Sequence, residues 1–73
     1  PTYDDVQAEG RVVVTIQVSP EGDVVSVSIN QRTNTVNQKL QQAALTAAAK
    51  TKFNAIGGLN NQTGTITYYF KQR

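Results

Sequence analysis

The chain has 73 residues and a net charge of +2, and it contains no cysteine, histidine, methionine or tryptophan. This length supports one small domain with a thin core, because small domains bury a smaller share of their surface. The missing residue types exclude a disulfide framework, a thiolate zinc site, and the Ser-His and Cys-His arrangements of nucleophilic enzymes.

The charge is divided unevenly along the chain. The first 23 residues carry all five acidic side chains and one arginine, whereas the residues from Val24 onward carry six basic side chains and no acidic one. A positive half can steer an acidic partner toward the protein. Because the bases are scattered along the chain, a solvated surface is the simpler interpretation.

Residues 1–9 are polar and lack periodicity, so they are interpreted as a lead-in to a domain over residues 10–73. Tyr3 and Val6 in this lead-in can still fold back onto the domain. The chain begins at Pro1 rather than methionine, which suggests a piece of a longer or processed protein.

Two segments, Arg11 to Val18 and Val24 to Asn30, alternate apolar with other residues, as half-buried strands do. Between them, Gly22 can take the positive φ that a hairpin loop needs. The sequence therefore predicts a hairpin. Its core-facing side chains are expected to be Val12, Val14, Ile16, Val18, Val25, Val27 and Ile29.

An alanine-rich stretch after the hairpin has helical periodicity. Thr35 is the expected N-cap, because Gln38 three residues later completes a capping-box pattern. The helix is expected from about Val36 to Thr51, with Phe53 just beyond it filling the core. One helical face carries mostly small side chains, which allow close approach to a sheet: Leu40, Ala43, Ala44, Ala47, Ala48 and Thr51.

A final alternating pattern predicts a third strand over residues 63–71. Its inward side chains are expected to be Ile66, Tyr68 and Phe70, and its outward ones Thr65, Thr67 and Tyr69. Because the helix returns the chain, the simplest sheet is antiparallel, with strand order 2-1-3 and the helix on one face. The predicted fold class is therefore α+β, a ββαβ domain with a three-stranded antiparallel sheet.

The predicted third strand has no fourth strand to pair with. The sheet therefore keeps an open backbone edge that can recruit another strand. We expect a peptide to dock along this whole strand: Thr63, Gly64, Thr65, Ile66, Thr67, Tyr68, Tyr69, Phe70 and Lys71. A homodimer can use the same edge, because the strand carries a charge only at its end.

Other kinds of site find little support in the sequence. Glu21 and Asp23 in the hairpin tip supply too few ligands for a calcium loop. Gly57 and Gly58 precede neither a helix nor a Lys-Ser/Thr pair, which argues against a phosphate-binding loop. Base stacking is disfavoured because only Tyr69 of the third strand's aromatic residues is expected to face solvent. We therefore predict no catalytic residues, metal ligands, cofactor or nucleic-acid partner.

Four segments in order carry a resemblance to a known family: Gly10 to Val18 (GRVVVTIQV), Ser19 to Val24 (SPEGDV), Leu40 to Phe53 (LQQAALTAAAKTKF) and Gly64 to Phe70 (GTITYYF). Together they resemble the C-terminal domain of TonB, the periplasmic energy transducer of Gram-negative bacteria. Two features depart from the family pattern. Thr51 stands where many members have tryptophan, and the Gln-Pro-x-Tyr-Pro segment that often precedes the first strand is absent.

The resemblance implies a protein-interaction domain rather than an enzyme. Such a domain would capture the TonB-box peptide of outer-membrane receptors by adding it beside the third strand, and so drive active transport. The full protein would be anchored in the inner membrane, reach through the periplasm and be driven by the ExbB–ExbD motor complex. The alternative is a small periplasmic or secreted inhibitor, or another interaction module, on the same scaffold.

Overall fold

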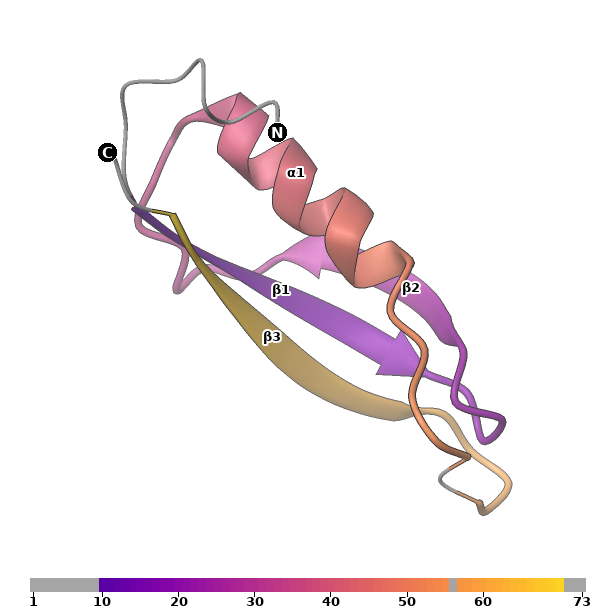
Figure 1. Cartoon of the computed structure of the whole chain (residues 1–73). Coiled ribbons are helices and arrows are strands. Elements are labelled where there is room, and N and C mark those ends of the chain that lie inside the picture. The colour runs from indigo at the N-terminus through magenta and orange to yellow at the C-terminus, as the bar shows by residue number, and fades with distance from the viewer. Residues whose placement is uncertain (1–9, 56, 71–73) are drawn as a thin grey trace.

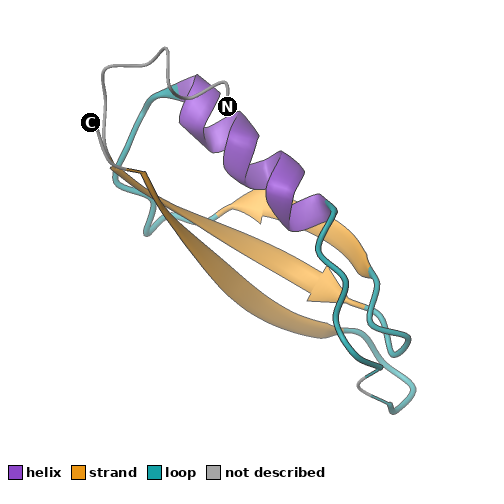
Figure 2. Cartoon of the chain, viewed as in Figure 1, coloured by secondary structure: helices purple, strands orange, loops and turns teal. Residues whose placement is uncertain are grey.

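The computed structural model describes residues 10–55 and 57–70, which form one sheet with a helix on one face (Figure 1, Figure 2). The elements are β1 (Gly10–Val18), β2 (Val24–Ile29), α1 (Gln38–Ala49) and β3 (Gln62–Phe70). The sheet has the order β2-β1-β3, and both strand pairs are antiparallel. The predicted α+β fold and strand order are confirmed. The predicted lead-in and Lys71 lie outside the described residues.

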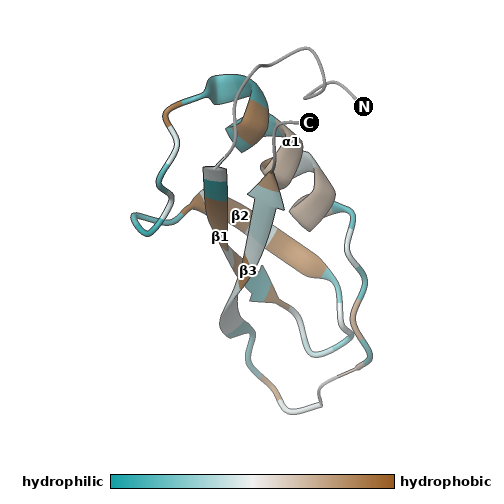
Figure 3. Cartoon of the chain, turned by 60° about the vertical axis from the view of Figure 1, so that its left-hand side comes forward, coloured by the Kyte–Doolittle hydropathy of each residue, from teal (hydrophilic) through white to brown (hydrophobic). Residues whose placement is uncertain are grey.

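The central strand β1 supplies most of the core. Its inward side chains and one row of α1 side chains form a single buried cluster: Val12, Val14, Ile16, Val18, Leu40, Ala44 and Ala48. Alanines in the row let the helix backbone approach the strand closely, so the short valine side chains are enough to fill the space. Figure 3 shows strongly hydrophobic colours on β1 and β2 and paler ones along β3.

The contact face of α1 is turned relative to the predicted one. Ala47, expected on the buried face, is exposed, whereas Leu45, which lies outside the predicted face, is half-buried against the core. Phe53 and Phe70, expected in the core, are half-buried and pack against the core cluster from its edge. Truncating either ring should therefore cost less than the ~3–5 kcal/mol typical of a fully buried phenylalanine.

The helix begins later than the sequence predicted, at Gln38 with Asn37 as its N-cap. The Asn37 side-chain oxygen accepts hydrogen bonds from the backbone N–H groups of Lys39 at 2.9 Å and Leu40 at 3.2 Å. The prediction of Thr35 as the cap is wrong, because Asn37 stands closer to the first turn and satisfies two of its free donors.

A bulge in β2 reverses part of its predicted alternation. Gln17 of β1 pairs with Ser26 and Val18 pairs with Val24, so Val25 is an extra residue between two pairs. The prediction that Val25 faces the core is wrong: its exposed fraction is 55%, and Val24 packs against the core instead. In a bulge, two residues of one strand lie opposite a single residue of its partner. The inward–outward alternation of β2 therefore shifts by one position, and the side chains before the bulge change face.

The chain after β2 continues alongside the first half of β1. Thr33 is central to this contact, since its hydroxyl accepts from the Val13 N–H at 2.8 Å and donates to the Val13 carbonyl at 3.1 Å. The guanidinium of Arg11 donates to the Arg32 carbonyl at 3.0 and 3.2 Å. The backbone groups of β1 that face β2 therefore keep hydrogen-bond partners beyond the end of β2, and β1 stays an interior strand along its length.

Candidate functional site

The hydrogen bonds of β1 determine which backbone groups of β3 face away from the sheet. Val13 directs its backbone toward β2, since its carbonyl accepts from Asn30 N at 2.7 Å and its N–H donates to Thr33. Backbone direction alternates along a strand, so Val14 points toward β3, where its partner is Ile66. Ile66 therefore directs its own backbone groups to β1, and the residues on either side of it face outward.

The outer edge of β3 consequently presents the N–H and C=O groups of alternate residues: Thr63, Thr65, Thr67 and Tyr69. The side chains of these residues are exposed, whereas those of Ile66, Tyr68 and Phe70 are half-buried against the core. The predicted inward and outward sets of β3 are thus confirmed. Within residues 10–55 and 57–70, no strand pairs with this outer edge.

The two edges of the sheet differ in how well they can accept another strand. β3 has nine residues and pairs with β1 in one unbroken register, so its outer edge is regular. β2 has six residues and contains the bulge at Val25. Short length and bulges protect an edge from further pairing, so the β3 edge is the better template for an added strand.

A pocket of about 200 Å³ opens beside the first half of β3. Its lining consists of Ile16 and Val18 from β1, Phe53 from the segment after α1, and residues 62–66 of β3. Gly64 leaves room here, because a Cβ at this position would meet no atom within 4 Å. Sequence reasoning missed the pocket, although a glycine within an alternating strand is a signal for a gap or a close approach.

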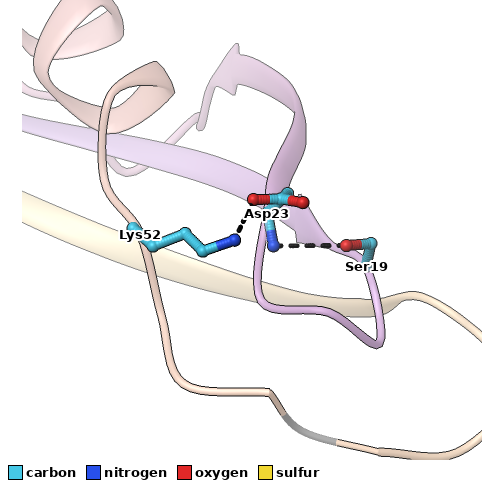
Figure 4. Close-up of polar contacts among 3 residues, drawn as sticks. All are labelled: Ser19, Asp23 and Lys52. Carbon is cyan, nitrogen blue, oxygen red and sulfur yellow. Dashed lines mark hydrogen bonds and ion pairs between the residues drawn. The ribbon is translucent and has the colours of Figure 1, made fainter.

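The β1–β2 turn holds Phe53 in the wall of this pocket. Asp23 and Lys52 form an isolated antiparallel bridge and an ion pair between their side chains (Figure 4). The Phe53 N–H donates to the Gly22 carbonyl at 2.9 Å, and the Ser19 hydroxyl accepts from the Asp23 N–H at 3.2 Å. Both charged side chains are more than half exposed, so the ion pair itself contributes little and the backbone contacts position Phe53.

Comparison with known protein families gives a match that spans nearly the whole chain. The family described as the Gram-negative bacterial TonB protein C-terminal matches residues 4–72. The chain belongs to this family. The resemblance inferred from the sequence is confirmed, whereas no curated protein and no solved structure matches the chain.

Family membership places the chain among TonB-type domains, which are periplasmic in Gram-negative bacteria and serve transport. TonB C-terminal domains interact with outer-membrane receptors and are protein-interaction domains rather than a family of enzymes. In the described part of this TonB domain, no cluster of three or more His, Cys, Asp or Glu could hold a metal ion. The same residues include no helix long and apolar enough to cross a membrane.

Proposed function

We propose that this TonB domain captures the TonB-box peptide of outer-membrane receptors by adding it as a strand to the outer edge of β3. The observation that supports this proposal is the row of outward backbone groups at Thr63, Thr65, Thr67 and Tyr69. Each of these residues offers one donor and one acceptor, so an added strand can bind through main-chain hydrogen bonds whatever its side chains are.

The side chains along this edge favour strand addition. The exposed residues of β3 are threonine, tyrosine and glutamine, and no charged residue lies between Gln62 and Phe70. Inward or edge charges are a common means of preventing edge pairing, and this strand lacks them. Threonine and tyrosine also have high strand propensity, which keeps the edge extended before a partner arrives.

In this proposal the domain is the receptor-binding part of a longer energy transducer. An inner-membrane anchor and a periplasmic linker outside the present sequence connect it to the ExbB–ExbD motor complex. The non-covalent attachment of the box peptide to β3 then transmits force to the receptor and drives active transport. The parent gene checks this part: an N-terminal membrane helix and a Pro/Lys/Glu-rich linker support it, whereas a plain signal peptide favours an inhibitor or other interaction module.

Proline substitution at the β3 edge should abolish most peptide binding without unfolding the domain. Each of Thr65→Pro, Thr67→Pro and Tyr69→Pro removes an outward N–H that the β1–β3 ladder does not use. At least one of them should weaken binding of a receptor box peptide about tenfold or more in titration calorimetry, since a partner carbonyl loses its donor. Circular dichroism reports whether the fold persists.

The matched control is Thr67→Val, which keeps the backbone N–H and the side-chain shape and should bind the peptide nearly as the wild type does. Unchanged affinity for box peptides in all three proline variants would contradict strand addition at β3.

The same edge should allow two copies of the domain to pair. A symmetric dimer through β3 would occupy the peptide site, so the dimer has to open before a box peptide binds. Sedimentation across a range of protein concentrations, with and without a box peptide, measures this competition. A dimer that dissociates as peptide is added agrees with a shared edge. A strict monomer, or a dimer that ignores saturating peptide, contradicts it.

A further inference from the structure

We propose that the pocket beside β3 receives one aliphatic side chain of the added strand and thereby sets the register in which that strand binds. This inference rests on the proposed strand addition, and it adds a side-chain preference to an interaction that otherwise involves only the backbone. The starting observation is that the pocket is lined in part by residues 62–66, the first half of the same open strand.

The cross-strand pairing shows which partner residue would reach the pocket. Ile16 pairs with Val27 on one side and with Gly64 on the other. The three residues therefore form one row across the sheet, on the face beneath α1. A strand added at the outer edge would place one residue opposite Gly64, and its side chain would project on the same face as that of Ile16. That side chain would continue the row directly over the gap that Gly64 leaves.

The neighbouring rows lack this gap. The row through Val14 ends at Ile66, and the row through Val18 ends at Gln62, so a β3 side chain already occupies the corresponding place in each. An added strand shifted by two residues would keep its backbone hydrogen bonds but would move its apolar side chain out of the pocket. The single glycine in β3 therefore distinguishes one register from the others.

The chemistry of the lining selects an aliphatic side chain. Ile16, Val18 and Phe53 present hydrocarbon, and no charged residue lines the pocket. A charged side chain placed there would lose its water without gaining a partner of opposite charge. The pocket is partly open and has a volume of about 200 Å³, which leaves room for one branched aliphatic group at the end of a strand residue. In Figure 1, α1 ends before the start of β3, and the segment after it continues past this end of the sheet.

Filling the pocket from within provides the test. Gly64 is outside the set of glycines with positive φ and has open space at its Cβ, so Gly64→Ala and Gly64→Val should fold normally. The probe is one receptor box peptide in which each position in turn is leucine or alanine. With the wild-type domain, leucine should bind about tenfold more tightly than alanine at one position only. With Gly64→Val this ratio should fall below about threefold, and Gly64→Ala should lie between.

Ser28→Val is the matched control, because it introduces a valine at an exposed position of β2, on the opposite edge of the sheet, and leaves the pocket empty; its leucine-to-alanine ratio should equal that of the wild type. The pocket proposal would be overturned if the wild-type leucine-to-alanine affinity ratio were the same at every peptide position. It would also be overturned if this ratio did not decrease from the wild type through Gly64→Ala to Gly64→Val. Strand addition would survive that result if the proline variants still lose binding. If no box peptide binds the wild-type domain, both proposals fail.

Discussion

Leu40→Ala should destabilise the domain by about 3–5 kcal/mol and leave little of it folded at room temperature. Leu40 is fully buried and is the largest of the side chains with no exposed surface. It lies at the start of the buried row of α1, where the other members are Ala44 and Ala48. Small alanines cannot move into the space, so the substitution would leave a cavity in a core that has few other large residues.

Urea unfolding followed by circular dichroism measures the effect of Leu40→Ala. A domain of this size has on the order of 5 kcal/mol of stability, so the expected loss removes most of it. Leu59→Ala is the control, because the Leu59 side chain is 96% exposed, and it should change the free energy of unfolding by less than about 0.5 kcal/mol. If Leu40→Ala costs no more than Leu59→Ala, the assignment of the helix–sheet core is wrong.

Gly22→Ala should be comparably damaging, for a different reason. Gly22 has φ of +95°, and an added Cβ would lie 2.2 Å from the carbonyl oxygen of Phe53. The Cβ position is fixed by the backbone of Gly22, and the oxygen belongs to the backbone of Phe53, so neither atom can turn aside as the end of a flexible side chain could. Relief of the clash would separate the turn from the segment after α1 and break the hydrogen bond from Phe53 N–H to the Gly22 carbonyl. We expect a loss of at least about 3 kcal/mol.

The chain provides a matched control for this second prediction in Gly58→Ala. Gly58 also has positive φ, at +82°, but a Cβ there would meet nothing within 4 Å. Only the backbone strain remains, and it should cost about 1–2 kcal/mol. Thermal melts of the two variants separate strain from steric exclusion. Equal losses in the two variants would show that the close approach of Phe53 to Gly22 adds nothing to the cost of the substitution.

These two predictions concern the helix–sheet core and the β1–β2 turn, whose contacts lie within the domain itself. β1 pairs with a strand on each side, whereas β3 pairs only with β1 among the described residues. In the proposed complex, an added strand would make β3 an interior strand and would cover the pocket beside Gly64. Binding of such a peptide to the folded state alone should also stabilise the domain, in proportion to the logarithm of peptide concentration above its dissociation constant.

The sequence by itself determined the elements and their order. Alternation in residues 11–18 and 63–70 reflects burial of one sheet face, a local property that a period of two reveals directly. A tight turn and a returning helix left β2-β1-β3 as the simplest sheet, and the ordered set of segments was sufficient to indicate the family. The position of β3 at the edge of the sheet formed by residues 10–55 and 57–70 followed from the same reasoning, because it depends only on the order of the three strands.

Only the tertiary structure decided the features that depend on contacts between distant residues. The bulge at Val25 depends on how β2 aligns with β1, and α1 begins only after Thr33 and Asn34 have made their hydrogen bonds to β1. The pocket exists because Gly22 allows Phe53 to approach the turn, about 30 residues away in the sequence, while Gly64 leaves a gap opposite. Local periodicity reports which face of a strand is buried, but it cannot report which backbone atoms meet when separate segments pack together.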